Sequence, residues 1–345
     1  MTRLKDIAQR SGVAVMTVSK ALRDKPDVSA ATKARIKLLA QQMGYVPDST
    51  AQGLRTRTTR LFGLVISSMT NPVYSRVVLP IEERAHEMGY EVLLAHTLNM
   101  PEREEICLRR LLGRHVEGLF IAPVYRMAAE APIYQELVAR RIPTVVLGHT
   151  APFCNQFANV ETDDLLASYA VTQHLLKLGH KRIAFFAGPL ATPWTQERFE
   201  GYRRALREIG LDVDDHLVFQ AGGTIEDGAK AALQMINESA DATAVQAVND
   251  VVAVGCAETL LSHGYKIPED ISVAGFGNIL LGAHFCVPLT TTRQPKFRLG
   301  SAAMDAMRAL LRGQGPESKR LPAALMVRAS TGAAPATSRL KQPKL

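Results

Sequence analysis

From Leu61 onward the sequence alternates between short apolar runs and amphipathic stretches, and this alternation restricts the possible folds more than any other feature. Apolar runs lie at 61–66, 90–95, 118–122 and 144–147, with helical stretches at about 72–88, 102–114 and 130–140. A second series begins after Asp163, with strands at 182–187, 217–219, 243–248 and 271–275 between helical stretches. Such alternation is typical of parallel sheets covered by helices. Two series therefore predict two similar open α/β lobes.

The boundaries of the lobes follow from the last elements of the chain. A helix at about 297–312 and a strand at about 324–329 fit most simply back into the two lobes. We therefore expect a body over 61–332, with lobe 1 at about 61–160 plus 293–320 and lobe 2 at about 161–290 plus 321–332. Residues 333–345 are rich in Ala, Pro, Ser and Lys without any period, which predicts a disordered tail.

The first 46 residues follow a different sequence pattern, that of three short helices. Apolar residues at helical spacing predict helices over 4–11, 15–23 and 30–43, and a polar connector follows over 47–60. Residues 1–60 carry twelve Lys and Arg against four Asp, a net charge of +8, which equals the charge of the whole chain. A basic N-terminal segment on a body without net charge is typical of proteins that bind a polyanion.

Three residues of this segment fit a helix-turn-helix. Ala8, Gly12 and Val18 stand at the fifth, ninth and fifteenth places of a window that begins at Leu4. Ala8 is small where the second helix crosses, Gly12 permits the sharp turn, and Val18 fills the space between the helices. In this motif the second helix enters the major groove of DNA by its N-terminal end.

The sequence resembles the LacI/GalR repressor family over about residues 2–332. In the N-terminal segment the resemblance rests on residues 4–8, 12–14, 17–22, 28–32 and 39–47, including Thr17-Val18-Ser19-Lys20-Ala21-Leu22. In the body it rests on residues 70–72, 116–119, 179–183, 249–250, 268–273 and 288–292. The resemblance implies an all-α helix-turn-helix headpiece joined to a two-lobed α/β body like that of periplasmic binding proteins.

The resemblance also implies which residues meet DNA. In the major groove it places Val15, Met16, Thr17 and Lys20, where Lys20 suits a guanine and the apolar pair suits a thymine methyl. Against the phosphate backbone it places Thr2, Ser19, Ser29 and Thr32, and Thr17 can serve there too. The connector matches the family's hinge helix, from which Ala51, Leu54 and Arg55 would enter the minor groove, Leu54 as a wedge between base pairs. Gly53 costs a helix about 1 kcal/mol relative to Ala, so we expect the hinge to fold only on DNA.

A small-molecule site is implied between the lobes. The family resemblance assigns it Val73, Tyr74, His149, Thr192, Trp194, Arg198, Asn249, Asp250 and Gln294. This chain departs from the family at two strand ends, where Gly148 and Gly277 stand in turns that commonly hold an Asp. The family resemblance implies a sugar or a sugar acid. Fewer carboxylates would reduce repulsion of an anion, so we expect an anionic effector such as a sugar acid, with Arg198 and His149 meeting its charge.

These features define the expected function and partners. We expect a transcription repressor that binds a palindromic double-stranded operator as a homodimer under control of the small molecule, its effector. Neither a cofactor nor a metal is expected, because phosphate-binding glycine loops, nucleophile elbows and metal-ligand spacings are lacking; the same lack argues against an enzyme. Four widely spaced cysteines suit free thiols in the cytoplasm, and no apolar run reaches the roughly 20 residues of a membrane helix.

Some alternatives stay open at this level. A transport-type solute-binding protein shares the two lobes but would lack residues 1–60. An activator or a global regulator would share every feature above. The sequence names neither the effector nor the direction of its effect, and a dimer is favoured over a tetramer because the C-terminal tail has only Leu340 and Leu345 as leucines.

Overall fold

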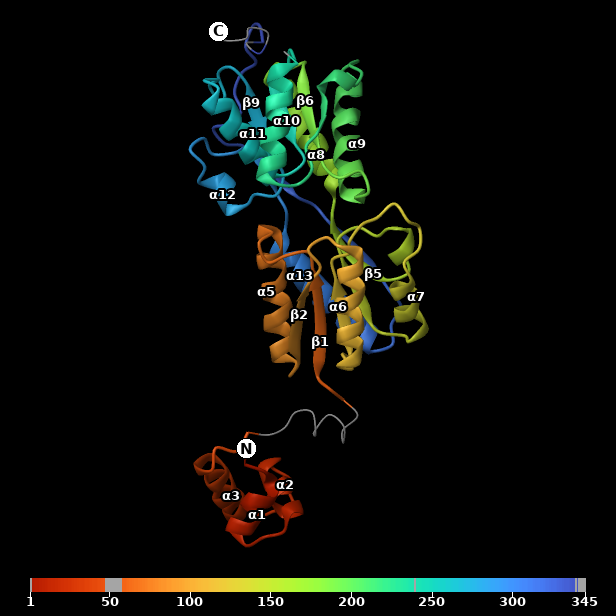
Figure 1. The fold of residues 1–345 in the computed structure, drawn as a ribbon, viewed down its shortest axis with the longest axis vertical. Helices are drawn as coiled ribbons and strands as arrows, with labels where there is room; N and C mark the ends of the chain where they lie inside the picture. The colour runs from red at the N-terminus through yellow and green to blue at the C-terminus, as the bar shows by residue number, and fades with distance from the viewer. Residues whose placement is uncertain (1, 47–57, 239, 339, 341–345) are drawn as a thin grey trace. The chain divides into compact units, whose positions relative to one another are not determined.

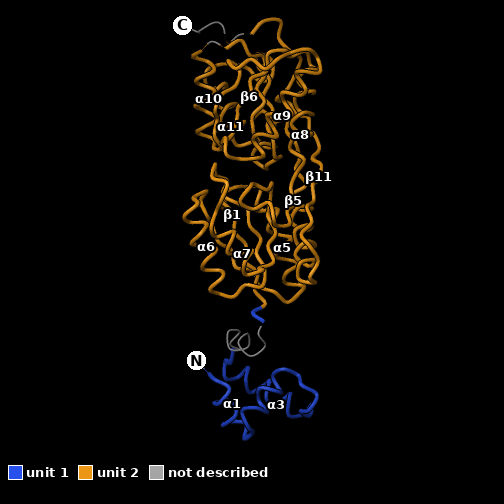
Figure 2. Tube along the Cα trace, turned by 90° about the vertical axis from the view of Figure 1, so that its right-hand side faces the viewer, with its two compact units in different colours: residues 1–59 blue, residues 60–345 orange. Residues whose placement is uncertain are grey.

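The chain forms two compact units. The structure, a computed structural model, describes residues 2–46, 58–238, 240–338 and 340. One unit, the head, comprises Met1–Thr59, and the other, the body, comprises Arg60–Leu345 (Figures 1 and 2).

The head is a bundle of α1 (Leu4–Ser11), α2 (Val15–Leu22) and α3 (Ala30–Gln42). Its core contains Ile7, Val18 and Ile36, none of which has exposed surface. Gly12 ends α1 with φ 71°, a left-handed conformation that favours glycine, and its N–H donates to the carbonyl of Ala8. The helix-turn-helix predicted from the sequence is therefore confirmed.

Lobe 1 contains a six-stranded sheet in the order β11-β5-β4-β3-β1-β2. All its strand pairs are parallel. Its consecutive elements are β1 (Leu61–Ile66), α5 (Pro72–Glu87), β2 (Glu91–His96), α6 (Pro101–Gly113), β3 (Gly118–Ile121), α7 (Pro132–Ala139), β4 (Thr144–Leu147) and β5 (Ala158–Thr162). Two later elements complete the lobe, α13 (Lys296–Leu311) and β11 (Ser318–Leu321).

Both faces of the lobe 1 sheet are buried. Along β1, Phe62, Leu64 and Ile66 point to the face covered by α5 and α13, and Val65 points to the face covered by α6 and α7 (Figure 1). A continuous apolar run such as β1 is typical of a strand with helices on both sides.

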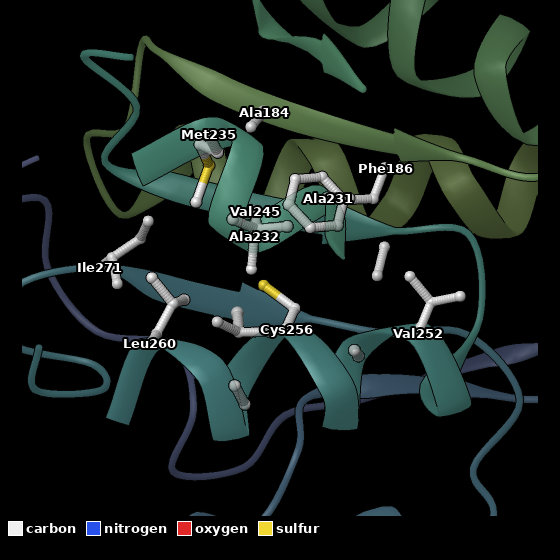
Figure 3. Packing of buried hydrophobic residues seen from close by; sticks show 14 of the residues in the cluster. Ala184, Phe186, Ala231, Ala232, Met235, Val245, Val252, Cys256, Leu260 and Ile271 are labelled. Atoms are coloured by element: carbon white, nitrogen blue, oxygen red, sulfur yellow. The ribbon is translucent and has the colours of Figure 1, made fainter. Parts of the chain in front are cut away.

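Lobe 2 repeats this plan with a four-stranded parallel sheet in the order β7-β6-β8-β9. Its elements are α8 (Asp164–Lys177), β6 (Ile183–Ala187), α9 (Pro193–Glu208), β7 (Val218–Gln220), α10 (Ile225–Asn237), β8 (Ala244–Ala247), α11 (Asp250–Ser262), β9 (Ser272–Ala274) and α12 (Leu280–Ala283). Phe186 of β6 packs with Met235 of α10 and Cys256 of α11 on one face (Figure 3). Phe185 packs on the opposite face with Tyr202 of α9.

The chain passes between the lobes after β5, after β10 (Thr291–Arg293) and after β11. The last segment, β12 (Ala324–Met326), pairs with β10 as an antiparallel ribbon against α8. The predicted two-lobed architecture with parallel sheets is confirmed.

Two features differ from the sequence-based expectations. The strands β5, β10 and β11 were not predicted; β11 reads Ser-Lys-Arg-Leu, and such a polar sequence is tolerated because β11 lies at the edge of its sheet. The tail was predicted to be disordered, yet its described residues pack on lobe 2. The N–H of Ala334 donates to Leu178, Ser338 donates to the carbonyl of Ala242, and Leu340 is buried in the lobe 2 core.

Candidate functional site

The N-terminal end of α2 presents apolar side chains to solvent. Val15 is 42% exposed and Met16 is 64% exposed, whereas Val18 of the same helix has no exposed surface. A buried Val18 holds α2 against the bundle, so the two preceding apolar residues are free to contact a partner. This is the surface from which the sequence predicts base contacts; the backbone N–H of Thr17 beside it bonds back to Ala14.

Lys20, the predicted guanine reader, is held by an acidic neighbour. Its Nζ donates to Oδ2 of Asp27, which lies in the turn before α3. This hydrogen bond and the charge of Lys20 keep the pKa of Asp27 below its ordinary value. The pair is exposed, so in the free protein it contributes little stability. Its effect is on the direction in which Lys20 points.

The hydroxyl groups of the predicted phosphate anchors form hydrogen bonds within the head. Ser29 caps α3 by accepting from the N–H of Thr32, and the two hydroxyls lie 2.8 Å apart. Thr2 donates to the carbonyl of Met43 at 2.7 Å, and Ser19 accepts from Arg23 at 3.1 Å. These bonds fix the hydroxyl groups in place. The predicted minor-groove residues Ala51, Leu54 and Arg55, and most of the 47–60 hinge, lie outside the described residues.

A cavity of about 880 Å³ lies between the two lobes of the body. Its lining includes all nine residues that the family resemblance assigned to the effector site: Val73, Tyr74, His149, Thr192, Trp194, Arg198, Asn249, Asp250 and Gln294. They come together because the carboxyl ends of the parallel strands in both lobes face the cavity, as expected for open α/β sheets. A cavity of this size holds a molecule of one or two sugar rings.

Helix caps at these strand ends position several lining residues. Asn71 caps α5 by accepting from the N–H of Val73 at 3.1 Å, which directs the first turn of α5 into the cavity. Asn249 caps α11 in the same way, accepting from Val252 at 2.8 Å. Because each Oδ1 is used in a cap, the amide NH₂ group of each Asn is the part available to a ligand.

Arg198 is held inside the protein by three hydrogen bonds. Its Nε and Nη2 donate to Oδ1 of Asp164 at 3.1 and 2.9 Å, and its Nη1 donates to the carbonyl of Val248 at 2.6 Å. The guanidinium lies 3.6 Å from the ring centre of Phe276 and 4.7 Å from that of Trp194. Burial raises the pKa of Asp164 despite the nearby charge of Arg198. Arg198 therefore shapes the cavity wall as one half of a buried ion pair.

His149 faces carboxylates as well. Its Nε2 lies 3.1 Å from Glu197, 3.5 Å from Asp164 and 4.0 Å from Glu161. Burial opposes a charge on the ring, but the hydrogen bond to Glu197 and the three negative charges outweigh it and raise the pKa of His149. Its backbone carbonyl accepts from the Tyr125 hydroxyl at 2.7 Å.

Asp250 organises the loops of lobe 2 around the cavity. Its Oδ1 accepts from the Thr291 hydroxyl at 2.5 Å and its Oδ2 accepts from the N–H of Ile279 at 2.8 Å. The carboxylate has no exposed surface, and this burial raises its pKa. Gln294, at the crossing after β10, donates to Thr162 at 3.3 Å.

This geometry removes the basis for the anionic effector expected from the sequence. Arg198 and His149, which were to meet its charge, each already face carboxylates. The cavity lining has more acidic than basic side chains, its acidic residues being Glu161, Asp164, Glu226 and Asp250. An anion would therefore meet repulsion.

Sequence reasoning missed the partners of the predicted residues. Asp164, Glu161, Tyr125 and Phe276 also line the cavity, and Glu197 lies directly behind it. One signal was available: Glu161 and Asp164 lie at or just beyond the end of β5, where polar residues gather in such folds.

Two further features, a metal site and a membrane-spanning helix, bear on the kinds of function open to the described residues. In the ranges that the structure describes, no three or more His, Cys, Asp or Glu side chains form a group able to hold a metal ion. No helix of those same ranges is both long and apolar enough to cross a membrane.

A helix-turn-helix head joined to a two-lobed body with a ligand-sized cavity defines the class of ligand-binding transcription regulators. Comparison with known proteins identifies the family. The model of bacterial regulatory proteins of the lacI family matches residues 3–48, and the model of the periplasmic binding protein-like domain matches residues 172–331.

Whole-length relatives agree with both matches. The HTH-type transcriptional repressor CytR of Escherichia coli (strain K12) is 31% identical over 335 residues, 96% of this chain and 97% of that protein. The ribose operon repressor of the same strain is 32% identical over 309 residues, 89% of this chain and 92% of that protein. The crystal structure of the Lac repressor dimer bound to operator and the anti-inducer ONPF has a TM-score of 0.85 at 26% identity, covering 96% of this chain and 99% of that one. This chain belongs to the lacI family and is a DNA-binding transcription regulator.

Proposed function

We propose that the protein is a repressor whose head reads a palindromic operator through α2. The observation that carries this proposal is the exposed pair Val15 and Met16 at the start of a helix anchored by the buried Val18. Val15, Met16 and Lys20 would contact base edges, and Thr2, Thr17, Ser19, Ser29 and Thr32 would contact phosphates. Ala51, Leu54 and Arg55 would occupy the minor groove from a hinge that folds on DNA.

Selection of bound sequences from a random duplex library tests this assignment. Met16→Ala and Lys20→Ala should each change the selected sequence at one position of each half-site, at a cost of about 1–3 kcal/mol there. Ser29→Ala should weaken binding to all duplexes by a similar factor and leave the selected sequence unchanged. A base-reading role for Lys20 is wrong if Lys20→Ala behaves like Ser29→Ala.

We further propose that the effector is neutral and rich in hydroxyl groups, such as a sugar or a nucleoside. The amide groups of Asn71, Asn249 and Gln294 can bind hydroxyls, and Trp194 and Tyr74 offer flat apolar surface to a ring. The relative named the ribose operon repressor supports an effector of this kind.

A thermal-shift screen tests the effector class, since a ligand that binds the folded protein raises its melting temperature. Neutral sugars and nucleosides, with ribose and cytidine among them, should include the stabilising compounds. Sugar acids of matching skeleton should have no effect. Stabilisation by an acid but not by its neutral counterpart would overturn this proposal.

We propose that the protein acts as a homodimer in the cytoplasm, where its DNA lies. Two heads match the two half-sites of a palindrome, and the Lac repressor relative is a dimer in its operator complex. Edge strand β2 and the turn after it expose Leu94, Leu98 and Met100, which is apolar surface that a second copy can cover. No catalytic activity is proposed.

A further inference from the structure

In the cavity wall and next to it, a cluster of charged side chains joins the two lobes. Lobe 1 contributes His149 from the loop after β4, Glu161 from β5 and Arg320 from β11. Lobe 2 contributes Glu197 from α9 and Asp164 from the start of α8. Glu197 is absent from the described residues that line the cavity, although the next residue, Arg198, is one of them.

Glu197 is the member of the cluster that joins the lobes most directly. Its Oε2 lies 3.1 Å from His149 Nε2, and its Oε1 accepts a hydrogen bond from Arg320 Nη2. Arg320 also donates from Nε to Glu161 at 2.8 Å, so its guanidinium is fixed by its own lobe. One side chain of lobe 2 is thus held by two side chains of lobe 1.

The protonation of His149 sets the strength of the attraction between the two lobes at this cluster. The charged groups that face it are Glu161, Asp164 and Glu197, with Arg198 paired to Asp164 and Arg320 paired to Glu161 and Glu197. A protonated His149 attracts all three carboxylates. A neutral His149 leaves three carboxylates to share two arginines, so the attraction between the lobes weakens.

We propose that Glu197 is a positioning residue that holds the two lobes at the angle which forms the effector cavity, by a latch to His149 and Arg320 that weakens as pH rises. This inference rests on the proposed effector role of the cavity. A molecule that contacts both lobes binds best when the lobes are already placed, so the latch favours effector binding and makes it dependent on pH.

The angle between the lobes can be measured without effector or DNA. Spin labels are attached to cysteines introduced at Met127 in lobe 1 and Ile209 in lobe 2, both exposed, in a Cys286→Ser background. The full chain is diluted with unlabelled protein, so that distances within one chain dominate. We expect one narrow distance distribution at about pH 6 and, at about pH 8.5, a loss of at least about half of that population.

Glu197→Gln should give the broad distribution at both pH values. Glu200→Gln is the matched control, because Glu200 lies on the same helix but pairs with Arg203 within α9. Nuclear magnetic resonance of labelled histidine should find the His149 pKa above its ordinary value in the parent chain and lowered by Glu197→Gln.

An inter-lobe distance that does not change with pH or with Glu197→Gln would overturn the latch, as would a His149 pKa at or below its ordinary value. Binding of operator DNA without effector, measured on the same proteins, shows separately whether the head functions. Failure of the latch is therefore distinguishable from failure of the proposed repressor function.

Discussion

Lys20 and Asp27 show how one residue can restrict another on a DNA-binding surface. Asp27 holds the Lys20 ammonium through a direct ion pair beside α2. Asp24, a second acidic residue of the same head, pairs instead with Lys37 of α3 at 2.7 Å. Asp27 repels phosphates and limits where Lys20 can reach, so it should favour one base contact over many phosphate contacts.

We expect Asp27→Asn to raise affinity for random DNA and to reduce the ratio of operator to random binding about tenfold, or about 1.4 kcal/mol. Asp24→Asn makes the same change of charge at a residue that pairs with Lys37 and not with Lys20, so it should raise both affinities and leave their ratio unchanged. Fluorescence anisotropy with an operator and a scrambled duplex measures both. If both variants lost the same fraction of the ratio of operator affinity to random-DNA affinity, specificity would depend on the net charge of the head and not on the Lys20–Asp27 pair.

For the individual residues of the cavity, the sequence predicted which of them line the site but not which side chains each of them contacts. The nine residues that the family resemblance assigned to the effector site line one cavity. The ion pair of Arg198 with Asp164 joins two different helices, α9 and α8. Where two helices cross depends on the tertiary packing, so no local sequence pattern predicts this pair. The expectation of an anionic effector did not take this ion pair into account.

Helix packing in lobe 1 depends on Gly300, at which α13 passes very close to α5. A Cβ on Gly300 would lie 2.2 Å from the carbonyl oxygen of Val77 and 2.6 Å from Pro80. At Gly113, the last residue of α6, a Cβ would meet nothing within 4 Å. Replacing Gly300 by Ala therefore introduces a steric clash, whereas replacing Gly113 by Ala changes helix propensity without one.

We expect Gly300→Ala to lower the free energy of unfolding by about 1–3 kcal/mol, because α5 and α13 must move apart. Gly113→Ala should be neutral or stabilising by up to about 1 kcal/mol. Urea unfolding followed by circular dichroism measures both. Similar stabilities for the two variants would mean that the helices can separate without cost.

Helices and strands with a clear apolar pattern could be predicted from the sequence. Strands that form only because a neighbouring strand supplies hydrogen bonds could not. The strands β1, β4 and β6 are continuous apolar runs, and their bounds follow from the sequence. In contrast, β11 is polar and exists because β5 beside it supplies hydrogen bonds. On α3 the apolar Leu38 is 57% exposed, because the three-helix bundle buries only the narrower stripe at Ile36 and Ala40.

At the scale of the whole molecule, the function requires two activities in one chain. The head carries the excess positive charge and the exposed apolar start of α2, whereas the body holds the cavity. The connector at 47–57, outside the described residues, is the only covalent path between them. We expect occupancy of the cavity to change operator affinity by about 5–150-fold, the usual range of coupling between two sites.

The most direct test is retention of genomic DNA fragments by the purified full-length chain at about 0.15 M salt, with and without the neutral compounds that raise its melting temperature. We expect a small set of palindromic fragments to be enriched, and at least one stabilising compound to change their retention at least about fivefold. Retention of no fragment above bulk DNA under any of these conditions would contradict the assignment of this chain as an effector-controlled repressor.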